Sequence, residues 1–169
     1  MTDASPHGMG GILVYGCVVI GHFIAAIADH DRKVLEVADD EKGQQRWEAL
    51  AILIAMRLWR TFSMDVRVAL TIQSGDASAL TFVDDLRAKG GGLRTIACEL
   101  ALGLAESSFD PGLAVHAPGV RNGVADALSR YYDPARAAAW KLPPALMDAK
   151  RCTPPRRGQQ WRRALSYSA

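Results

Sequence analysis

The spacing of the apolar residues changes several times along this chain, and these changes restrict its possible folds more than any other feature. Residues 10–28 are rich in β-branched side chains and interrupted by glycine, which is typical of antiparallel strands joined by tight turns. Residues 42–62 follow a helical period instead, and residues 66–72 alternate between apolar and other side chains as a strand does. The chain therefore begins with strands and then mixes strands with helices.

Further periodic segments follow. Residues 78–88 and 93–108 predict two helices separated by three glycines, and residues 111–115 predict a short strand. Asn122 is the expected N-cap of a final helix that ends near Arg130. The resulting order, β-β-β-α-β-α-α-β-α, predicts an α/β protein whose mixed sheet is covered by helices.

Length and composition fit a single folded domain with a tail. The chain has 169 residues, of which 49% are hydrophobic and 22% are charged. Its longest apolar runs, residues 10–28 and 49–59, are interrupted, whereas a membrane span needs roughly 20 predominantly apolar residues. We see no signal-peptide pattern, so we expect an intracellular protein, in the cytoplasm or nucleus, with no membrane partner.

Basic residues gather at the C-terminal end. Residues 150–169 contain six Lys and Arg residues and no acidic residue. A basic tail of this kind can bind the phosphates of a nucleic acid, and it can equally be a solvated linker to another domain.

Four acidic residues stand at the ends of predicted elements or on an otherwise apolar face: Asp3, Glu48, Asp76 and Asp126. Taken alone, each is compatible with a cap, a turn or a surface charge. Carboxylates that are brought together raise one another's pKa unless cations neutralise them, so a cluster of four predicts a magnesium site. Two such ions about 3.5–4 Å apart activate a water molecule and stabilise the leaving oxygen of a phosphodiester.

The same acids lie in four short motifs, which read T-D-A-S-P-H-G-M-G-G at residues 2–11, W-E-A-L at 47–50, S-G-D at 74–76 and H-A-P-G-V-R-N-G-V-A-D-A-L-S-R at 116–130. The last motif resembles the H-x-P-G-x-x-N-x-x-A-D-x-L-S-R signature of retrotransposon polyproteins, and the first is nearly as distinctive. Over about residues 1–132, the chain resembles the ribonuclease H domain of a retroelement reverse transcriptase.

This resemblance implies a ribonuclease H-like fold, with a five-stranded mixed sheet flanked by helices. Residues 133–169 then form a proline-containing, basic C-terminal tail or linker. The implied activity is hydrolysis of the RNA strand of an RNA–DNA hybrid with two Mg²⁺ ions, for which Mn²⁺ is a substitute. A polymerase domain covalently linked upstream is the implied partner.

The resemblance also assigns roles to single residues. Asp3, Glu48 and Asp126 match the carboxylates that hold one metal ion, and Asp3 with Asp76 matches those that hold the other. His116 matches a histidine that assists proton transfer or product release, although a hydrogen bond within its loop is an equally good interpretation. Asn122 matches a loop asparagine, which we interpret mainly as the helix cap.

Substrate contacts are expected from two places. Ser5, His7 and Gly8 belong to a loop beside Asp3 whose backbone amides can meet phosphate. Three basic residues flank the triple glycine and form either a basic prominence against the duplex or solvated surface charge: Arg87, Lys89 and Arg94. Hybrids are recognised by groove shape and 2′-hydroxyl groups, and we find no base-reading motif.

Two departures from the family pattern keep other functions open. Ala77 follows Asp76 where the family usually has asparagine, and only Met1 and Thr2 precede Asp3 where the family has several apolar residues. We therefore expect a truncated first strand. The alternatives are a catalytically inactive ribonuclease H-like module with a structural or nucleic-acid-binding role, and a domesticated host protein that uses the fold for binding.

Overall fold

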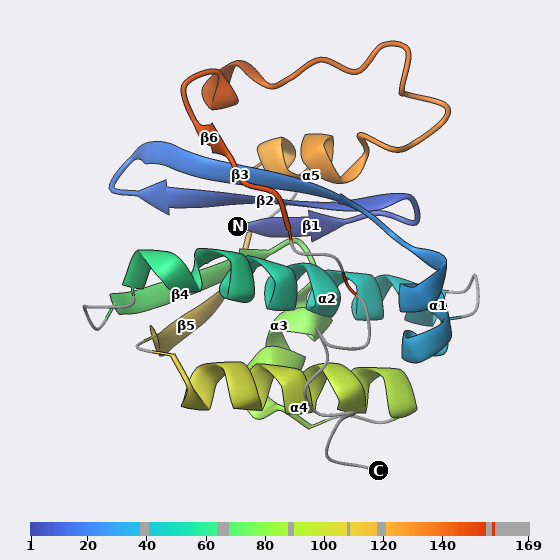
Figure 1. Ribbon diagram of the computed structural model, residues 1–169, viewed down its shortest axis with the longest axis vertical. Helices are drawn as coiled ribbons and strands as arrows, with labels where there is room; N and C mark the ends of the chain where they lie inside the picture. The colour runs from blue at the N-terminus through green and yellow to red at the C-terminus, as the bar shows by residue number, and fades with distance from the viewer. Residues whose placement is uncertain are drawn as a thin grey trace.

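The computed structural model describes residues 1–37, 41–63, 68–87, 90–107, 109–117, 121–154 and 157. Within these ranges the chain forms six strands, five α-helices and two 3₁₀ segments (Figure 1). The strands are β1 (Thr2–Ala4), β2 (Gly8–Tyr15), β3 (Val18–Ala26), β4 (Val68–Ser74), β5 (Phe109–His116) and β6 (Lys150–Arg151). The helical elements are α1 (Asp29–Leu35), α2 (Glu41–Trp59), η1 (Arg60–Ser63), α3 (Ala77–Asp85), α4 (Gly91–Ala105), α5 (Gly123–Ser129) and η2 (Pro144–Leu146). The predicted α/β class is confirmed.

All six strands belong to one mixed sheet in the order β5-β4-β1-β2-β3-β6. Strands β1, β2 and β3 form an antiparallel meander, whereas β4 is parallel to both β1 and β5. The prediction of five strands is wrong by one, because β6 adds to the outer edge of β3 through the pairs Gly21–Lys150 and His22–Arg151. Since β1 and β4 are parallel neighbours, their C-terminal ends lie at the same edge of the sheet.

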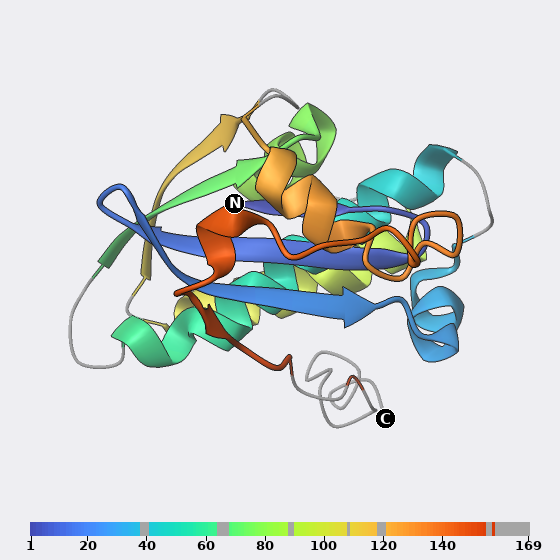
Figure 2. The ribbon, with the colours of Figure 1, turned by 90° about the horizontal axis from the view of Figure 1, so that it is seen from above.

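Helices cover both faces of this sheet (Figures 1 and 2). Helix α2 crosses one face of the sheet, and helices α3 and α4 pack against α2. Helix α5 lies on the opposite face, over β1 and β2. The larger core lies on the α2 side and includes Phe23, Leu50 and Leu100. Residues 49–56 of α2 are all buried, because this helix is enclosed between the sheet and two other helices. A smaller core under α5 includes Ile12 and Leu128.

Gly10 allows α5 to lie very close to β2. A Cβ atom on Gly10 would lie 2.3 Å from Leu128 Cβ and 2.7 Å from the backbone nitrogen of Ser129. Any side chain there would push α5 away from the sheet. Because α5 carries Asp126 and Ser129, this close packing also determines how near those residues come to β1.

We expect Gly10→Ala to lower the free energy of unfolding by about 1–3 kcal/mol, the usual effect of overpacking a core. Gly103→Ala is the matched control, because Gly103 lies within α4 and a Cβ there has no atom within 4 Å. That variant should gain about 0.5–1 kcal/mol from the higher helix propensity of alanine. Chemical denaturation measures both changes, and equal stability of the two variants would contradict the packing of α5 on Gly10.

Residues beyond the predicted domain boundary at 132 contact the sheet and its helices. Leu146 is buried in the core under α5, and Trp140 Nε1 donates a hydrogen bond to Ala127 O at 2.7 Å. Arg157 Nε donates to both carboxylate oxygens of Asp31 in α1, at 3.1 and 2.9 Å. The boundary at 132 therefore separates parts of the chain that pack together.

The predicted elements agree with the structure to within a few residues, apart from three that the sequence did not indicate. The predicted helix 42–62 corresponds to α2 followed by η1, and the predicted helices 78–88 and 93–108 correspond to α3 and α4. Helix α1, η2 and β6 were not predicted. None of the helices in the described ranges combines the length and the apolar character that a membrane crossing requires.

Candidate active site

Asp3 lies in the middle of β1, opposite Gly10 of β2, and its side chain faces α5. Ser129 Oγ donates a hydrogen bond to Asp3 Oδ2 at 2.7 Å, and Asn122 Nδ2 donates to Asp3 Oδ1 at 3.1 Å. Burial raises the pKa of Asp3 to about 6, the hydrogen bond from Ser129 opposes this rise, and the charge of Asp126 adds to it. Both oxygens of this carboxylate are therefore oriented by donors from the α5 region.

Glu48 extends from α2 to the junction between β1 and β4. Its Oε1 accepts hydrogen bonds from Ala4 N and Gln44 Nε2, each at 3.1 Å, and its Oε2 accepts one from Ser74 Oγ at 3.1 Å. Burial is the main reason that the pKa of Glu48 rises to about 8, and the negative charges of Asp3 and Asp76 contribute as well. Glu48 is therefore a buried acid whose ionised form is disfavoured by its neighbours.

Asp76 follows the C-terminal end of β4 and caps the N-terminus of α3. Its Oδ1 accepts hydrogen bonds from Ser78 N at 2.7 Å and Ala79 N at 3.2 Å. Ser74 Oγ, which donates to Glu48, also accepts a hydrogen bond from Asp76 N at 3.2 Å. A single serine therefore links the second and third acids of the candidate site.

Asp126 lies in the first turn of α5 and is partly exposed. Arg130 Nε, one turn later, donates to Asp126 Oδ1 at 2.7 Å. Asn122 occupies the N-cap position of α5, but its side chain makes no cap hydrogen bond and donates instead to Thr2 O and Asp3 Oδ1. The interpretation of Asn122 as mainly a cap is therefore wrong, because its amide connects the start of α5 to β1.

His116 ends β5 and is exposed. Its Nε2 lies 3.0 Å from Gly75 O, and a carbonyl oxygen only accepts, so this nitrogen carries the proton in that contact. Gly75 directly precedes Asp76, so the imidazole lies beside the carboxylate edge of the sheet. The hydrogen bond of His116 therefore crosses to the connection between β4 and α3 and does not lie within the loop that follows β5, and a role of His116 at the site stays a prediction.

The four predicted acids gather at the edge where β1 and β4 end. Electrostatic influence connects Asp3 with Asp126, and connects Glu48 with both Asp3 and Asp76. As the side chains lie, no group of three or more His, Cys, Asp or Glu residues within the described ranges is arranged to hold a metal ion. Ser129, Asn122 and Arg130 donate hydrogen bonds to oxygens of Asp3 and Asp126.

The residues predicted to contact substrate lie in different environments. Ser5 is buried, and its hydroxyl donates to Ser129 O at 2.9 Å and accepts hydrogen bonds from the backbone of His7 and Gly8. Gly8 is buried too, whereas His7 is exposed, with Nε2 3.8 Å from Asp133 Oδ1. The hydroxyl of Ser5 therefore stabilises its own loop. Arg87 and Arg94 are exposed, and Lys89 lies outside the described residues.

Sequence reasoning did not assign a role to four polar residues around the acids. Ser74, Ser129 and Arg130 lie within the motifs that resemble the ribonuclease H family. The sequence therefore did contain a signal that these residues belong to the site. Gln44 precedes Glu48 by four residues and therefore shares its face of α2; its Nε2 also donates to Ala4 O at 2.7 Å. These side chains hold the carboxylates in place.

Comparisons of this chain with protein-family models, with curated proteins and with solved structures give no match.

The raised pKa of Glu48 predicts a pH-dependent effect of Glu48→Gln. Because its pKa is near 4.5 in the unfolded chain and about 8 in the folded protein, the folded state binds more protons between these values, and its stability falls as pH rises. With a chelator present, the variant should match the parent near about pH 5 and exceed its free energy of unfolding by a few kcal/mol near about pH 8.

Denaturation of both proteins across this pH range measures the difference. Glu106→Gln is the control, because Glu106 is an exposed glutamate outside the site that pairs with Arg60. A difference between Glu48→Gln and the parent that stays constant with pH would contradict the burial and repulsion described for Glu48.

Proposed function

We propose that this chain is a magnesium-dependent endonuclease that cleaves the RNA strand of RNA–DNA hybrids, as the ribonuclease H-like module of a retroelement reverse transcriptase. The observation that carries the proposal is the convergence of Asp3, Glu48, Asp76 and Asp126. They come from β1, α2, the β4–α3 junction and α5, and they meet at one edge of the sheet. The mixed sheet with helices on both faces supports the same assignment.

The chemistry of these residues suits a hard divalent cation. All four side chains offer carboxylate oxygens, the ligands that Mg²⁺ and Mn²⁺ prefer. Burial and mutual repulsion raise the pKa values of Asp3 and Glu48, so a bound cation would relieve an electrostatic cost that the protein carries. When bound, two such ions activate a water molecule and stabilise the leaving oxygen of the phosphodiester.

The residues of the site then have distinct roles. Asp3, Glu48 and Asp126 would hold one cation, and Asp3 with Asp76 would hold the other. Ser129 and Asn122 orient the carboxylate of Asp3 through hydrogen bonds. Ser74 fixes the position of Glu48 relative to Asp76, because its hydroxyl is hydrogen-bonded to both residues. His116, next to Gly75, assists proton transfer or the release of the cleaved strand.

A second function, binding of nucleic acid without cleavage, is favoured by one specific observation. Arg130 donates to Asp126 Oδ1, and Asn122 and Ser129 each donate to one oxygen of Asp3, so protein donors already bind three of the four oxygens of these two carboxylates. A module of this kind would keep the ribonuclease H-like fold as a structural or nucleic-acid-holding part of a larger polyprotein.

A cleavage assay separates the two functions. The purified chain is incubated with a hybrid whose RNA strand is end-labelled, in Mg²⁺ or in chelator, beside RNA–RNA and DNA–DNA duplexes of the same sequence. We expect cleavage of the RNA strand in the hybrid only, dependent on the cation and unchanged by Asp84→Asn, a control acid exposed on α3. A hybrid that is bound but uncut in both Mg²⁺ and Mn²⁺ would establish the binding function instead.

A further inference from the structure

The segment that follows α5 combines aromatic and basic residues. Residues 130–141 read R-Y-Y-D-P-A-R-A-A-A-W-K, with three aromatic residues, three basic residues and one acid. Most of this segment lies beyond residue 132, where the resemblance to the ribonuclease H family ends. Proteins that bind single-stranded nucleic acid commonly combine such residues, because basic side chains meet the phosphates and aromatic rings stack on the bases.

Two of the three aromatic rings are anchored in the protein, and they support the third. Tyr131 and Trp140 pack against the core under α5, and Trp140 Nε1 is hydrogen-bonded to Ala127 O. The ring of Tyr131 is nearly perpendicular to both other rings, with centroids 4.9 Å from Tyr132 and 4.7 Å from Trp140. Edge-to-face contacts of this kind are favourable. Tyr132 itself is 43% exposed, so its ring is supported by the protein and open to a ligand.

Asp133 holds the backbone turn that follows Tyr132. Its carbonyl oxygen accepts hydrogen bonds from Arg136 N at 3.0 Å and Ala137 N at 2.9 Å. Its Oδ1 accepts another from Ala135 N at 2.9 Å. Aspartate side chains stabilise turns in this way. The turn therefore brings Arg136 back to the residue that directly follows the exposed ring.

Two basic side chains flank the carboxylate of Asp133. Arg136 Nε lies 3.8 Å from Asp133 Oδ2, and His7 Nε2 lies 3.8 Å from Asp133 Oδ1. The side chains of Arg136 and His7 are 58% and 44% exposed, whereas that of Asp133 is only 16% exposed. The two basic groups therefore reach the solvent beside Tyr132, where they can donate hydrogen bonds to phosphate oxygens.

This surface lies beside the candidate active site. Figure 2 shows the segment after α5, in orange, next to the blue loop that joins β1 to β2. A Cβ atom on Gly8, where β2 begins, would lie 3.2 Å from Tyr132 Cδ2. Ser5 in the same loop donates to Ser129 O, and the hydroxyl of Ser129 donates to Asp3. A strand bound at Tyr132 would therefore lie close to the carboxylate edge.

We propose that Tyr132, Arg136 and His7 form a binding surface for single-stranded nucleic acid, with a base stacked on Tyr132 and neighbouring phosphates at Arg136 and His7. Stacking requires an accessible base face, and paired bases in a duplex cover one another's faces, so the ligand is a single strand. Stacking recognises the base and not the sugar, so both RNA and DNA bind. This binding needs neither a cation nor cleavage, so it is independent of the proposed endonuclease activity.

The test measures the affinity of the full chain for fluorescein-labelled oligoadenylate and oligodeoxyadenylate, by fluorescence anisotropy in chelator. We expect Tyr132→Ala to weaken the binding of both strands by about 5–150-fold, the range for loss of one base stacked on an aromatic ring. Tyr132→Phe retains the ring and should bind about as tightly as the parent. Thermal melting of each variant shows that it is folded, and little change is expected because Tyr132 is exposed.

The salt dependence of the affinity separates stacking from charge. For a single strand, each phosphate contact contributes about 0.7 to the slope of log affinity against log salt concentration. Arg136→Gln should therefore lower this slope by about that amount. Tyr132→Ala should lower the affinity and leave the slope unchanged, because a tyrosine ring carries no charge.

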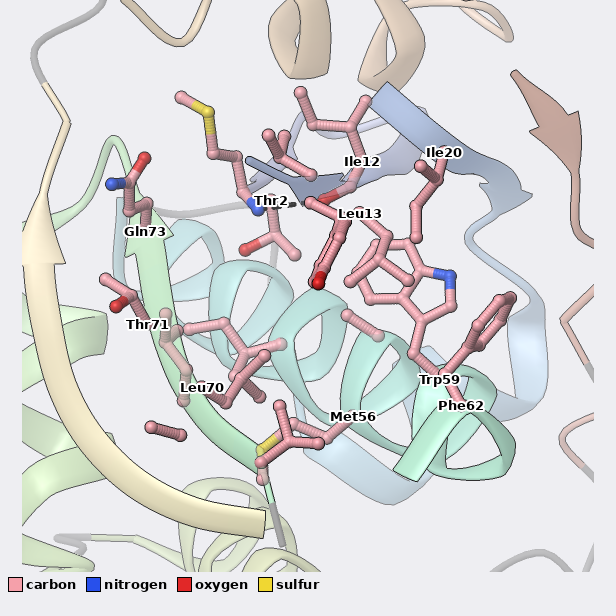
Figure 3. A pocket seen from close by; sticks show the side chains of 18 of the residues that line it. Thr2, Ile12, Leu13, Ile20, Met56, Trp59, Phe62, Leu70, Thr71 and Gln73 are labelled. Carbon is pink, nitrogen blue, oxygen red and sulfur yellow. Dashed lines mark hydrogen bonds between the residues drawn. The ribbon is translucent and has the colours of Figure 1, made fainter. Parts of the chain in front are cut away.

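Tyr15→Ala is the matched control at another exposed tyrosine. Tyr15 is 79% exposed and lies at an apolar groove of about 600 Å³ between β2 and β4 (Figure 3). The described residues that line this groove include no Lys, Arg or His, so the groove offers no basic side chain to a phosphate. Tyr15→Ala should therefore bind single strands as the parent does.

Three results would overturn the proposal. Equal affinity of folded Tyr132→Ala and the parent would show that single strands bind elsewhere, for example at the basic residues of the C-terminal tail, or do not bind. An equal loss of affinity in Tyr15→Ala would show that the effect is not specific to this surface. If Tyr132→Ala weakened the binding of a blunt-ended RNA–DNA duplex as much as that of the single strands, the surface would be a duplex contact instead.

Discussion

Asp76→Asn is expected to lower hybrid cleavage by about 10³-fold or more, while the melting temperature stays unchanged or rises slightly. Removing a metal-holding carboxylate costs several kcal/mol of transition-state stabilisation, which corresponds to a rate loss of that size. The fold should survive, because the side chain of Asp76 caps α3 through Ser78 N and Ala79 N, and asparagine caps a helix as well as aspartate does. Loss of one charge also relieves repulsion of Glu48.

Cleavage rate, melting temperature and the stabilisation by Mg²⁺ are measured together for this variant. A cation that binds only the folded protein raises its stability by mass action, so Mg²⁺ should stabilise the parent more than Asp76→Asn. Asp84→Asn controls for loss of a charge elsewhere on α3. Cleavage at the parent rate, or equal stabilisation of both proteins by Mg²⁺, would remove Asp76 from the metal site.

His116→Ala is expected to slow turnover by about 10–10⁴-fold, a range that covers acid–base catalysis and slower product release. Metal affinity should not change, because the hydrogen-bond partner of the His116 side chain is the backbone oxygen of Gly75 and His116 is not one of the four carboxylates assigned to the metal ions. Little stability should be lost, since the side chain is exposed and this hydrogen bond is made at the surface.

His116→Gln distinguishes a catalytic role from a structural one. Glutamine can donate a hydrogen bond to Gly75 O as the imidazole does, but it cannot transfer a proton near neutral pH. Slow turnover in both variants supports a role in the reaction, and parent-like turnover in His116→Gln would mean that the histidine only supports its loop. His7→Ala, at another exposed histidine, controls for general effects of removing an imidazole.

Much of the fold follows from local patterns in the sequence. Helix α2 and strand β4 have clear periods of their own, and the glycines near residue 10 allow the close approach of α5. The elements that sequence reasoning missed depend on distant partners. Helix α1 has alanine at its N-cap, and its buried Asp31 pairs with Arg157, 126 residues away. Strand β6 consists of two residues whose strand conformation comes from pairing with β3.

For the candidate site, the motifs predicted the four acids but not the side chains that hydrogen-bond to them. The sequence contains Asn122 in a position typical of a helix cap, and only the fold brings its amide to Asp3. Likewise, Ser74 can bridge Glu48 and Asp76 only because the fold brings α2 next to the end of β4.

The most direct test of the proposed metal site is the position of a bound cation. Mn²⁺ prefers the same oxygen ligands as Mg²⁺, and its anomalous scattering locates it in a crystal of the parent chain. We predict anomalous density among the carboxylates of Asp3, Glu48, Asp76 and Asp126, and loss of that density in crystals of Asp3→Asn. Density at another place in the molecule, or density at this edge that persists in Asp3→Asn, would contradict the assignment of these four acids as a metal site.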